Sequence, residues 1–202
     1  MQLQEGNPPA AAFSALTASS KLQHLDLNRC MLPAAVWQHV FAAGRQLPQL
    51  RYLNIGHVTK ASSGAAAAAA PEGSRLVSCC PGLQHLDVQQ LQYSAEGLAP
   101  LQRLSELHTL RLATNSGEGL EAVSQLTGLQ ELYLVAGCAA ADRLLLQLTQ
   151  LKQLTSLDFH GPTYVRQNVC QVGGPTLHAC HLLSEPVCGC FRFRLLRMVC
   201  LI

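Results

Sequence analysis

The spacing of leucines in residues 22–32, Leu-Gln-His-Leu-Asp-Leu-Asn-Arg-Cys-Met-Leu, constrains the fold more than any other feature of the chain. Leu25 and Leu27 alternate with polar residues, as they do in a strand that buries one of its two faces. Leu22 and Leu32 are apolar positions that lead into and out of this strand. The stretch therefore predicts a short strand with one apolar side and one polar side.

The same spacing recurs along the chain. Each copy has an aliphatic or aromatic residue at its first, fourth and sixth positions, and successive copies start 22 to 33 residues apart. Repeats of this length indicate one supersecondary unit each, stacked so that neighbouring units share a continuous core. The first positions of the six units are Leu22, Leu50, Leu83, Leu107, Leu129 and Leu154.

The first unit fits the pattern L-x-x-L-x-L-x-x-N/C-x-L at every specified position, and the chain resembles the leucine-rich repeat family over residues 10–165. The resemblance implies an α/β fold: a leucine-rich repeat solenoid of the ribonuclease-inhibitor-like kind. Such a solenoid has a curved parallel sheet on its concave side and short helices on its convex side. At the turn position, Cys30 and Asn115 fit the pattern, whereas the other units hold Val58, Leu91, Gly137 and Pro162.

A short apolar segment follows each predicted strand, and we expect a helix there that returns the chain to the next strand. In the first unit Pro33 opens the helix, Trp37 and Phe41 lie on its buried side, and Gly44 ends it. In the segment before the first strand, Phe13 and Leu16 are expected on the inner face of a helix. Further helices are expected over 75–79, 97–104, 119–126 and 142–148.

The composition divides the chain into three parts. Residues 1–9 are polar with two prolines, and we expect them to be disordered. The repeat domain spans residues 10–165, with a poly-alanine insertion near 61–72 that does not supply enough apolar area to fold on its own. Residues 166–202 match no repeat, and we expect an irregular, cysteine-rich, basic tail that is disordered.

Charge and targeting signals restrict the possible partners and the cellular compartment of the chain. The net charge of +2 is concentrated in the tail, where four arginines outweigh Glu185, so the repeat domain is about neutral and we expect no nucleic-acid binding. The opening residues contain neither a basic run nor an apolar segment, which predicts no secretory signal. We therefore interpret the nine cysteines, including the adjacent Cys79 and Cys80, as reduced thiols in the cytoplasm.

The side chains between the leucines form the candidate binding site. On a repeat sheet these side chains form two parallel rows on the concave face, one from the third and one from the fifth position of each unit. Tyrosine and arginine are the residue types that dominate binding hot spots, so we expect this face to bind a protein. The twelve candidates are His24, Asp26, Tyr52, Asn54, His85, Asp87, Thr109, Arg111, Glu131, Tyr133, Ser156 and Asp158.

The sequence contains little that indicates a catalytic site or a metal-binding site. His-Leu-Asp occurs at residues 24–26 and 85–87, but these copies lie two repeats apart, too far for one metal ion. The histidines and cysteines of residues 178–190 lack the spacing of a zinc site. No nucleotide-binding, hydrolase or metalloprotease motif is present. We therefore expect no catalytic residues, no metal, no cofactor and no small-molecule substrate.

The leading hypothesis is a non-enzymatic protein–protein interaction module that acts as a scaffold or as a substrate adaptor of a ubiquitin ligase. Family resemblance leaves F-box-associated and axonemal settings open, so the cytoskeleton or a cilium axoneme are the more specific locations. The alternative is a membrane-peripheral protein held by its basic, cysteine-rich tail, over residues 166–202. An enzyme that uses the thiols or a metal of this tail is the third hypothesis.

Overall fold

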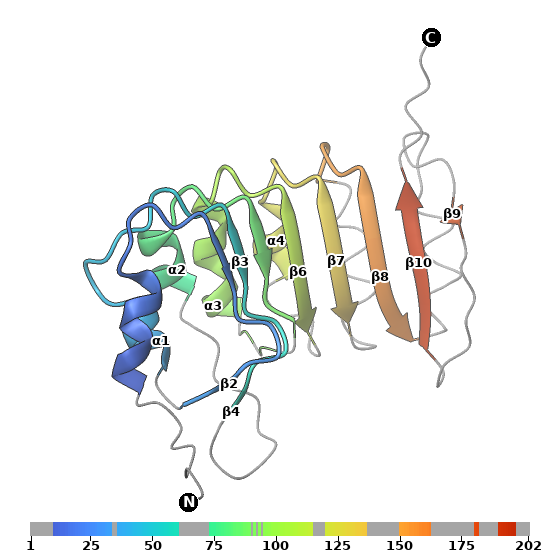
Figure 1. The fold of residues 1–202 in the computed structure, drawn as a ribbon. Coiled ribbons are helices and arrows are strands. Elements are labelled where there is room, and N and C mark those ends of the chain that lie inside the picture. The colour runs from blue at the N-terminus through green and yellow to red at the C-terminus, as the bar shows by residue number, and fades with distance from the viewer. Residues whose placement is uncertain are drawn as a thin grey trace, which may run out of the picture.

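The computed structural model describes residues 10–33, 36–60, 73–89, 91, 93, 95–114, 120–136, 150–162, 180–181 and 190–196. Six parallel strands follow one another through a single sheet in the order in which they occur along the chain (Figure 1). They are β1 (His24–Asp26), β3 (Tyr52–Asn54), β5 (His85–Asp87), β6 (Thr109–Thr114), β7 (Glu131–Ala136) and β8 (Ser156–Pro162). The predicted α/β class and parallel sheet are confirmed.

Each strand begins at the third position of a predicted unit, and the strands pair without a shift in register. Leu53 of β3, for example, is the partner of Leu25 in β1 and of Leu86 in β5. The fourth-position leucines are all buried, and transfer of each out of water contributes roughly 1.5–3 kcal/mol. This inner row consists of Leu25, Leu53, Leu86, Leu110, Leu132 and Leu157.

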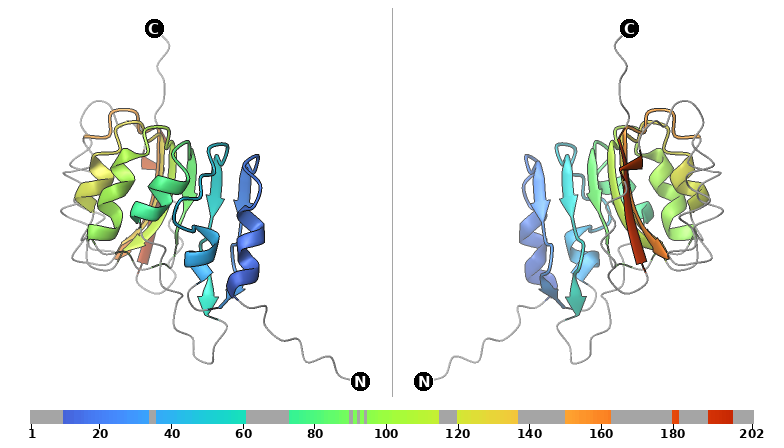
Figure 2. Two further views of the ribbon diagram at one scale, coloured as in Figure 1. Left: turned by 90° about the vertical axis from the view of Figure 1, so that its left-hand side faces the viewer. Right: turned by 90° about the vertical axis from the view of Figure 1, so that its right-hand side faces the viewer.

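Helices return the chain between strands and stand on one side of the sheet, as the two side views show (Figure 2). The described helices are η1 (Ala10–Thr17), α1 (Val36–Val40), α2 (Gly73–Cys79), α3 (Ala95–Leu98), η2 (Ala99–Arg103) and α4 (Leu120–Ser124). The opposite side of the sheet is uncovered by described helices, and its side chains form the candidate site.

The first two helices confirm the predicted burial of their aromatic residues and correct the prediction for one leucine. In α1, Trp37 is buried, and Phe41, the residue after the helix, is also buried. Gly44 adopts a left-handed conformation with φ 78°. The segment before β1 is a 3-10 helix in which Phe13 packs on the core, but Leu16 is 39% exposed. The prediction that Leu16 lies on the inner face is wrong: Thr17 is buried instead, and its hydroxyl donates a hydrogen bond to the Val40 carbonyl at 2.7 Å.

The turn position behaves as an apolar site in two of the units that depart from the pattern. Val58 and Leu91 are both buried, whereas Cys30 in the first unit is partly buried against the core. Beside the first two turns, β2 (Met31–Leu32) pairs in parallel with β4 (Thr59–Lys60) as a second small sheet. The loss of Asn or Cys therefore does not disturb the order of the main strands.

The C-terminal tail departs from prediction. Strand β10 (Cys190–Leu196) pairs antiparallel with β8, and β9 (Cys180–His181) pairs antiparallel with β10. The prediction of an irregular tail is wrong for these two segments. The physical reason lies in residues 191–195, Phe-Arg-Phe-Arg-Leu, which alternate with the period of a strand and carry aromatic residues that favour sheets. Pairing with β8 satisfies backbone groups that an edge strand leaves unpaired.

Several sequence predictions lie outside the described residues. These are the disorder of residues 1–9, the poly-alanine insertion of residues 61–72 and the helix over 142–148. The remainder of residues 166–202, apart from β9 and β10, also lies outside them.

Candidate partner-binding face

The two predicted rows of side chains exist as aligned positions of the sheet. The third-position residues are register partners from His24 in β1 through to Ser156 in β8, and the fifth-position residues are aligned in the same way from Asp26 to Asp158. Because successive residues of a strand point to opposite faces, both rows lie on the side opposite the inner leucines. We call this side of the sheet the polar face.

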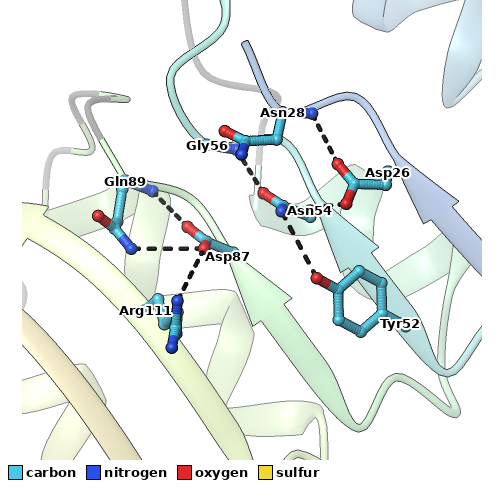
Figure 3. A network of polar contacts seen from close by, with 8 residues as sticks. All are labelled: Asp26, Asn28, Tyr52, Asn54, Gly56, Asp87, Gln89 and Arg111. Carbon is cyan, nitrogen blue, oxygen red and sulfur yellow. Dashed lines mark hydrogen bonds and ion pairs between the residues drawn. The ribbon is translucent and has the colours of Figure 1, made fainter.

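The fifth-position side chains of β1, β3 and β5 close the turns that follow these strands (Figure 3). Asp26 accepts a hydrogen bond from the backbone N–H of Asn28 at 2.8 Å, and Asn54 accepts one from Gly56 at 3.1 Å. In β5, Asp87 accepts one from the backbone N–H of Gln89 at 3.1 Å. These are Asx turns, in which a short polar side chain replaces a backbone acceptor. Asp or Asn at the fifth position thus has a structural role.

This role leaves two of the twelve candidates largely buried. Asn54 is 7% exposed and Asp87 is 6% exposed, so each offers little of its side chain to a partner, and their part in an interface stays a prediction. Gly56 contributes to this burial, since a Cβ atom at Gly56 would lie 2.7 Å from Asp87 Oδ1. The absence of a side chain at the seventh position lets the Asp87 carboxylate approach the neighbouring turn.

The third-position row begins with three stacked rings. The ring of Tyr52 lies between those of His24 and His85, with centroid distances of 3.9 Å and 4.4 Å and interplanar angles of 4° and 12°. Burial lowers the pKa of His85, and the nearby Arg111 lowers it further, although Asp87 and Glu131 act in the opposite direction. The strand of Tyr52 separates the two histidines, so the three rings form a flat aromatic platform.

Arg111 of β6 contacts residues of both neighbouring strands on the polar face. Its Nη1 atom lies 3.9 Å from Asp87 Oδ2, and its guanidinium carbon lies 5.5 Å from the ring centroid of Tyr133. The arginine side chain is 48% exposed, whereas that of Asp87 is 8% exposed. Arg111 is therefore oriented by a buried carboxylate and an aromatic ring, yet it keeps half of its surface available to a partner.

Two of the hollows that described residues line lie on the polar face. The larger has a volume of about 420 Å³ and extends across the strand ends from the turn after β1 to β7. Six of the predicted candidates line it: Tyr52, Asn54, His85, Asp87, Arg111 and Tyr133. The smaller, of about 130 Å³, is lined by Leu132 together with the candidates Thr109, Arg111, Glu131, Tyr133, Ser156 and Asp158. His24 and Asp26 line neither hollow.

Four residues that were not among the predicted candidates also line the larger hollow: Asn28, Arg29, His57 and Gln89. They occupy the seventh and eighth positions of their units, in the turns that follow the strands. Arg29 and His57 both have positive φ, 59° and 56°, which is uncommon for residues other than glycine. Both occupy the eighth position, and this shared offset is the sequence signal that could have identified them.

The described residues contain no group of three or more histidine, cysteine, aspartate or glutamate side chains that could hold a metal ion. No helix within the described ranges is long and apolar enough to cross a membrane. Cys79 and Cys80 are free thiols in the core, and burial raises the pKa of both, that of Cys80 to about 12. Such thiols are poor nucleophiles.

A scan of the chain against protein-family models and a search of curated proteins found no match.

Proposed function

We propose that the chain is a leucine-rich repeat solenoid that binds a protein partner on the polar face and catalyses no reaction. The observation that carries this proposal is the combination of an unshifted parallel sheet with large polar side chains on the side that described helices leave uncovered. In the proposed solenoid this side is the concave one. A rigid sheet holds these side chains in fixed positions, so little conformational entropy is lost when a partner binds.

The composition of the face supports a protein partner over a small ligand. Tyr52, Tyr133 and Arg111 are partly exposed and are held by neighbouring groups, as binding hot spots usually are. The larger hollow is open and polar, whereas sites for small molecules are usually enclosed and largely apolar. Shape and charge along the two rows would select the partner, as a scaffold or a ubiquitin-ligase substrate adaptor requires.

Site-specific photo-cross-linking tests the proposal. A Thr109→p-benzoylphenylalanine substitution places the reactive group in the middle of the polar face, and the same substitution at exposed Gln125, beyond α4, is the matched control. We expect a cross-linked species of defined mass from Thr109 and none from Gln125 in cells that express the chain. Combining Tyr133→Ala with Arg111→Ala should reduce the yield from Thr109 about tenfold or more, as loss of hot-spot residues does.

The opposite pattern would count against the proposal. Cross-linking from Gln125 alone would place the partner on the helical side, and equal yields with and without Tyr133 and Arg111 would remove these residues from the interface. The alternative suggested by the sequence, membrane association through the tail over residues 166–202, remains a separate prediction. It is tested by fractionation of the chain with and without this tail.

A further inference from the structure

We propose that the larger hollow recognises an extended acidic segment of the partner, an inference that rests on the proposed function of the polar face. Two arginines, Arg29 and Arg111, line the hollow and are exposed. His57 and His85 line it as well and are partly exposed. Arginine presents up to five N–H donors in a planar arrangement that matches the oxygens of a carboxylate.

The negative charge among the described residues of this lining is withdrawn from solvent. It belongs to Asp87, whose Oδ1 accepts a hydrogen bond from the Gln89 backbone and whose Oδ2 accepts one from Gln89 Nε2 at 3.4 Å. Oδ2 also faces Arg111 at 3.9 Å. Because the carboxylate is buried and the guanidinium is half-exposed, this ion pair presents its positive member to an approaching ligand.

Asp26, which flanks the hollow, is exposed but is similarly engaged. Its Oδ1 accepts the Asn28 backbone N–H, and its Oδ2 lies 3.4 Å from the Nδ2 donor of Asn54. Its capacity to compete with a ligand carboxylate for Arg29 is therefore reduced.

The spacing of the two arginines suggests how the segment would lie. Arg29 follows β1 and Arg111 belongs to β6, with β3 and β5 between them, so they are roughly 14 Å apart across the sheet at about 4.8 Å per strand. An extended peptide advances about 3.4 Å per residue, and side chains an even number of residues apart share one side. Two carboxylates four residues apart would therefore span the separation of the two arginines across the strands, and the long arginine side chains would cover their offset along the strands.

The acidic segment would end near β7, because the sign of the exposed charge changes there. Glu131 is exposed and Asp158 is partly exposed, and both line the smaller hollow beside Arg111. Carboxylates of a ligand would be repelled at this end and attracted at the other. From the turn after β1 to β7, the exposed charge that lines the hollows thus changes from the cation of Arg29 to the carboxylate of Glu131.

The test measures fluorescence anisotropy of labelled peptides with the purified full chain. Two nonapeptides of identical composition carry two glutamates on a serine–glycine background, either four residues apart or adjacent. We expect the spaced peptide to bind about threefold or more tightly than the adjacent one, and its affinity to fall as sodium chloride is added. The variant R29Q should weaken binding of the spaced peptide by about three- to tenfold.

Two further variants serve as controls, one of which should change peptide binding in the opposite direction and one of which should not change it. E131Q removes a repelling carboxylate and should strengthen binding, whereas R103Q removes an exposed cation on η2, on the helical side, and should leave it unchanged. Circular dichroism of each variant would establish that it is folded. Equal binding by R29Q and the unaltered chain, or equal binding of the two peptides, would overturn the inference.

A third measurement tests whether the hollow prefers an acidic peptide or a nucleic acid. Tighter binding of a thymidine oligonucleotide than of the spaced peptide at the same salt concentration would also overturn the inference. This failure is distinguishable from failure of the proposed function, because cross-linking from Thr109 reports a partner whatever its charge. A cross-linked partner together with no preference for acidic peptides would retain the binding face and reject its specificity.

Discussion

Tyr52 and His85 stack ring on ring across β3 and β5, with their centroids 4.4 Å apart. Burial at this position, together with the nearby Arg111, lowers the pKa of His85 and so disfavours its charged form. The folded chain therefore binds a proton at this histidine at lower pH than the unfolded chain does. The stacked platform is thus linked to the pH dependence of stability.

His85 should make the chain less stable in acid. Because its folded pKa lies below the ordinary value of 6.5, its contribution is complete above pH 6.5 and is lost as the pH falls below it. We expect the urea midpoint to fall on acidification through this range, and to fall less in His85→Gln. Equal falls in the two proteins, measured by circular dichroism, would assign the acid sensitivity to other groups.

Asp87 should matter to stability through its turn more than through its ion pair. Asp87→Ala leaves the Gln89 backbone N–H without its acceptor and should lower the free energy of unfolding by about 1–3 kcal/mol. Asp87→Asn keeps an acceptor, as Asn54 does in the preceding unit, and should cost less. Urea denaturation of both variants measures the difference. Equal losses in Asp87→Asn and Asp87→Ala would make the pairing with Arg111, which both variants remove, the dominant contribution.

Leu86 should be among the most sensitive positions of the core. Its side chain is fully buried at the centre of the sheet, between Leu53 and Leu110. Leu86→Ala should cost about 2–5 kcal/mol, and Leu86→Asp should prevent folding because it buries an unpaired charge. Gln102→Ala, at an exposed position of η2, is the control and should change the thermal midpoint little. A thermal melt of Leu86→Asp like that of the unaltered chain would contradict this packing.

Cys80 should resist alkylation in the folded chain. Its thiol is buried, and its pKa is raised to about 12, so the reactive thiolate is scarce at neutral pH. Treatment with iodoacetamide, followed by peptide mass spectrometry, should label Cys80 only after urea is added. Cys30, which is partly exposed, provides the internal comparison. Rapid labelling of Cys80 without urea would show that the core opens around α2.

The sequence predicted the sheet well because each strand is specified by its own spacing of leucines. A one-residue shift at Leu53 or Leu86 would expose the apolar row, so register follows from pattern. The site was harder to predict. The spacing identifies which residues share a face, but the burial of Asn54 and Asp87 depends on turns whose geometry comes from neighbouring units.

Residues beyond the strands escaped selection for a related reason. Arg29 and His57 reach the larger hollow from turns with positive φ, and the sequence pattern of the strands carries no information about this conformation. In the tail, the alternation over residues 191–195 was visible, but the regular leucine spacing that identified the other strands was absent. A strand recruited by an open edge is specified by tertiary context as much as by its own residues.

The reversal of chain direction at β10 has an evolutionary consequence. From β1 to β8 all strands run the same way, so duplication of one unit within this stretch would lengthen the sheet and preserve its hydrogen-bond pattern. A unit appended after β8 would find that edge already paired with β10, which runs the opposite way and whose hydrogen bonds are spaced differently. Expansion by duplication is thus favoured inside the array and opposed at its C-terminal boundary.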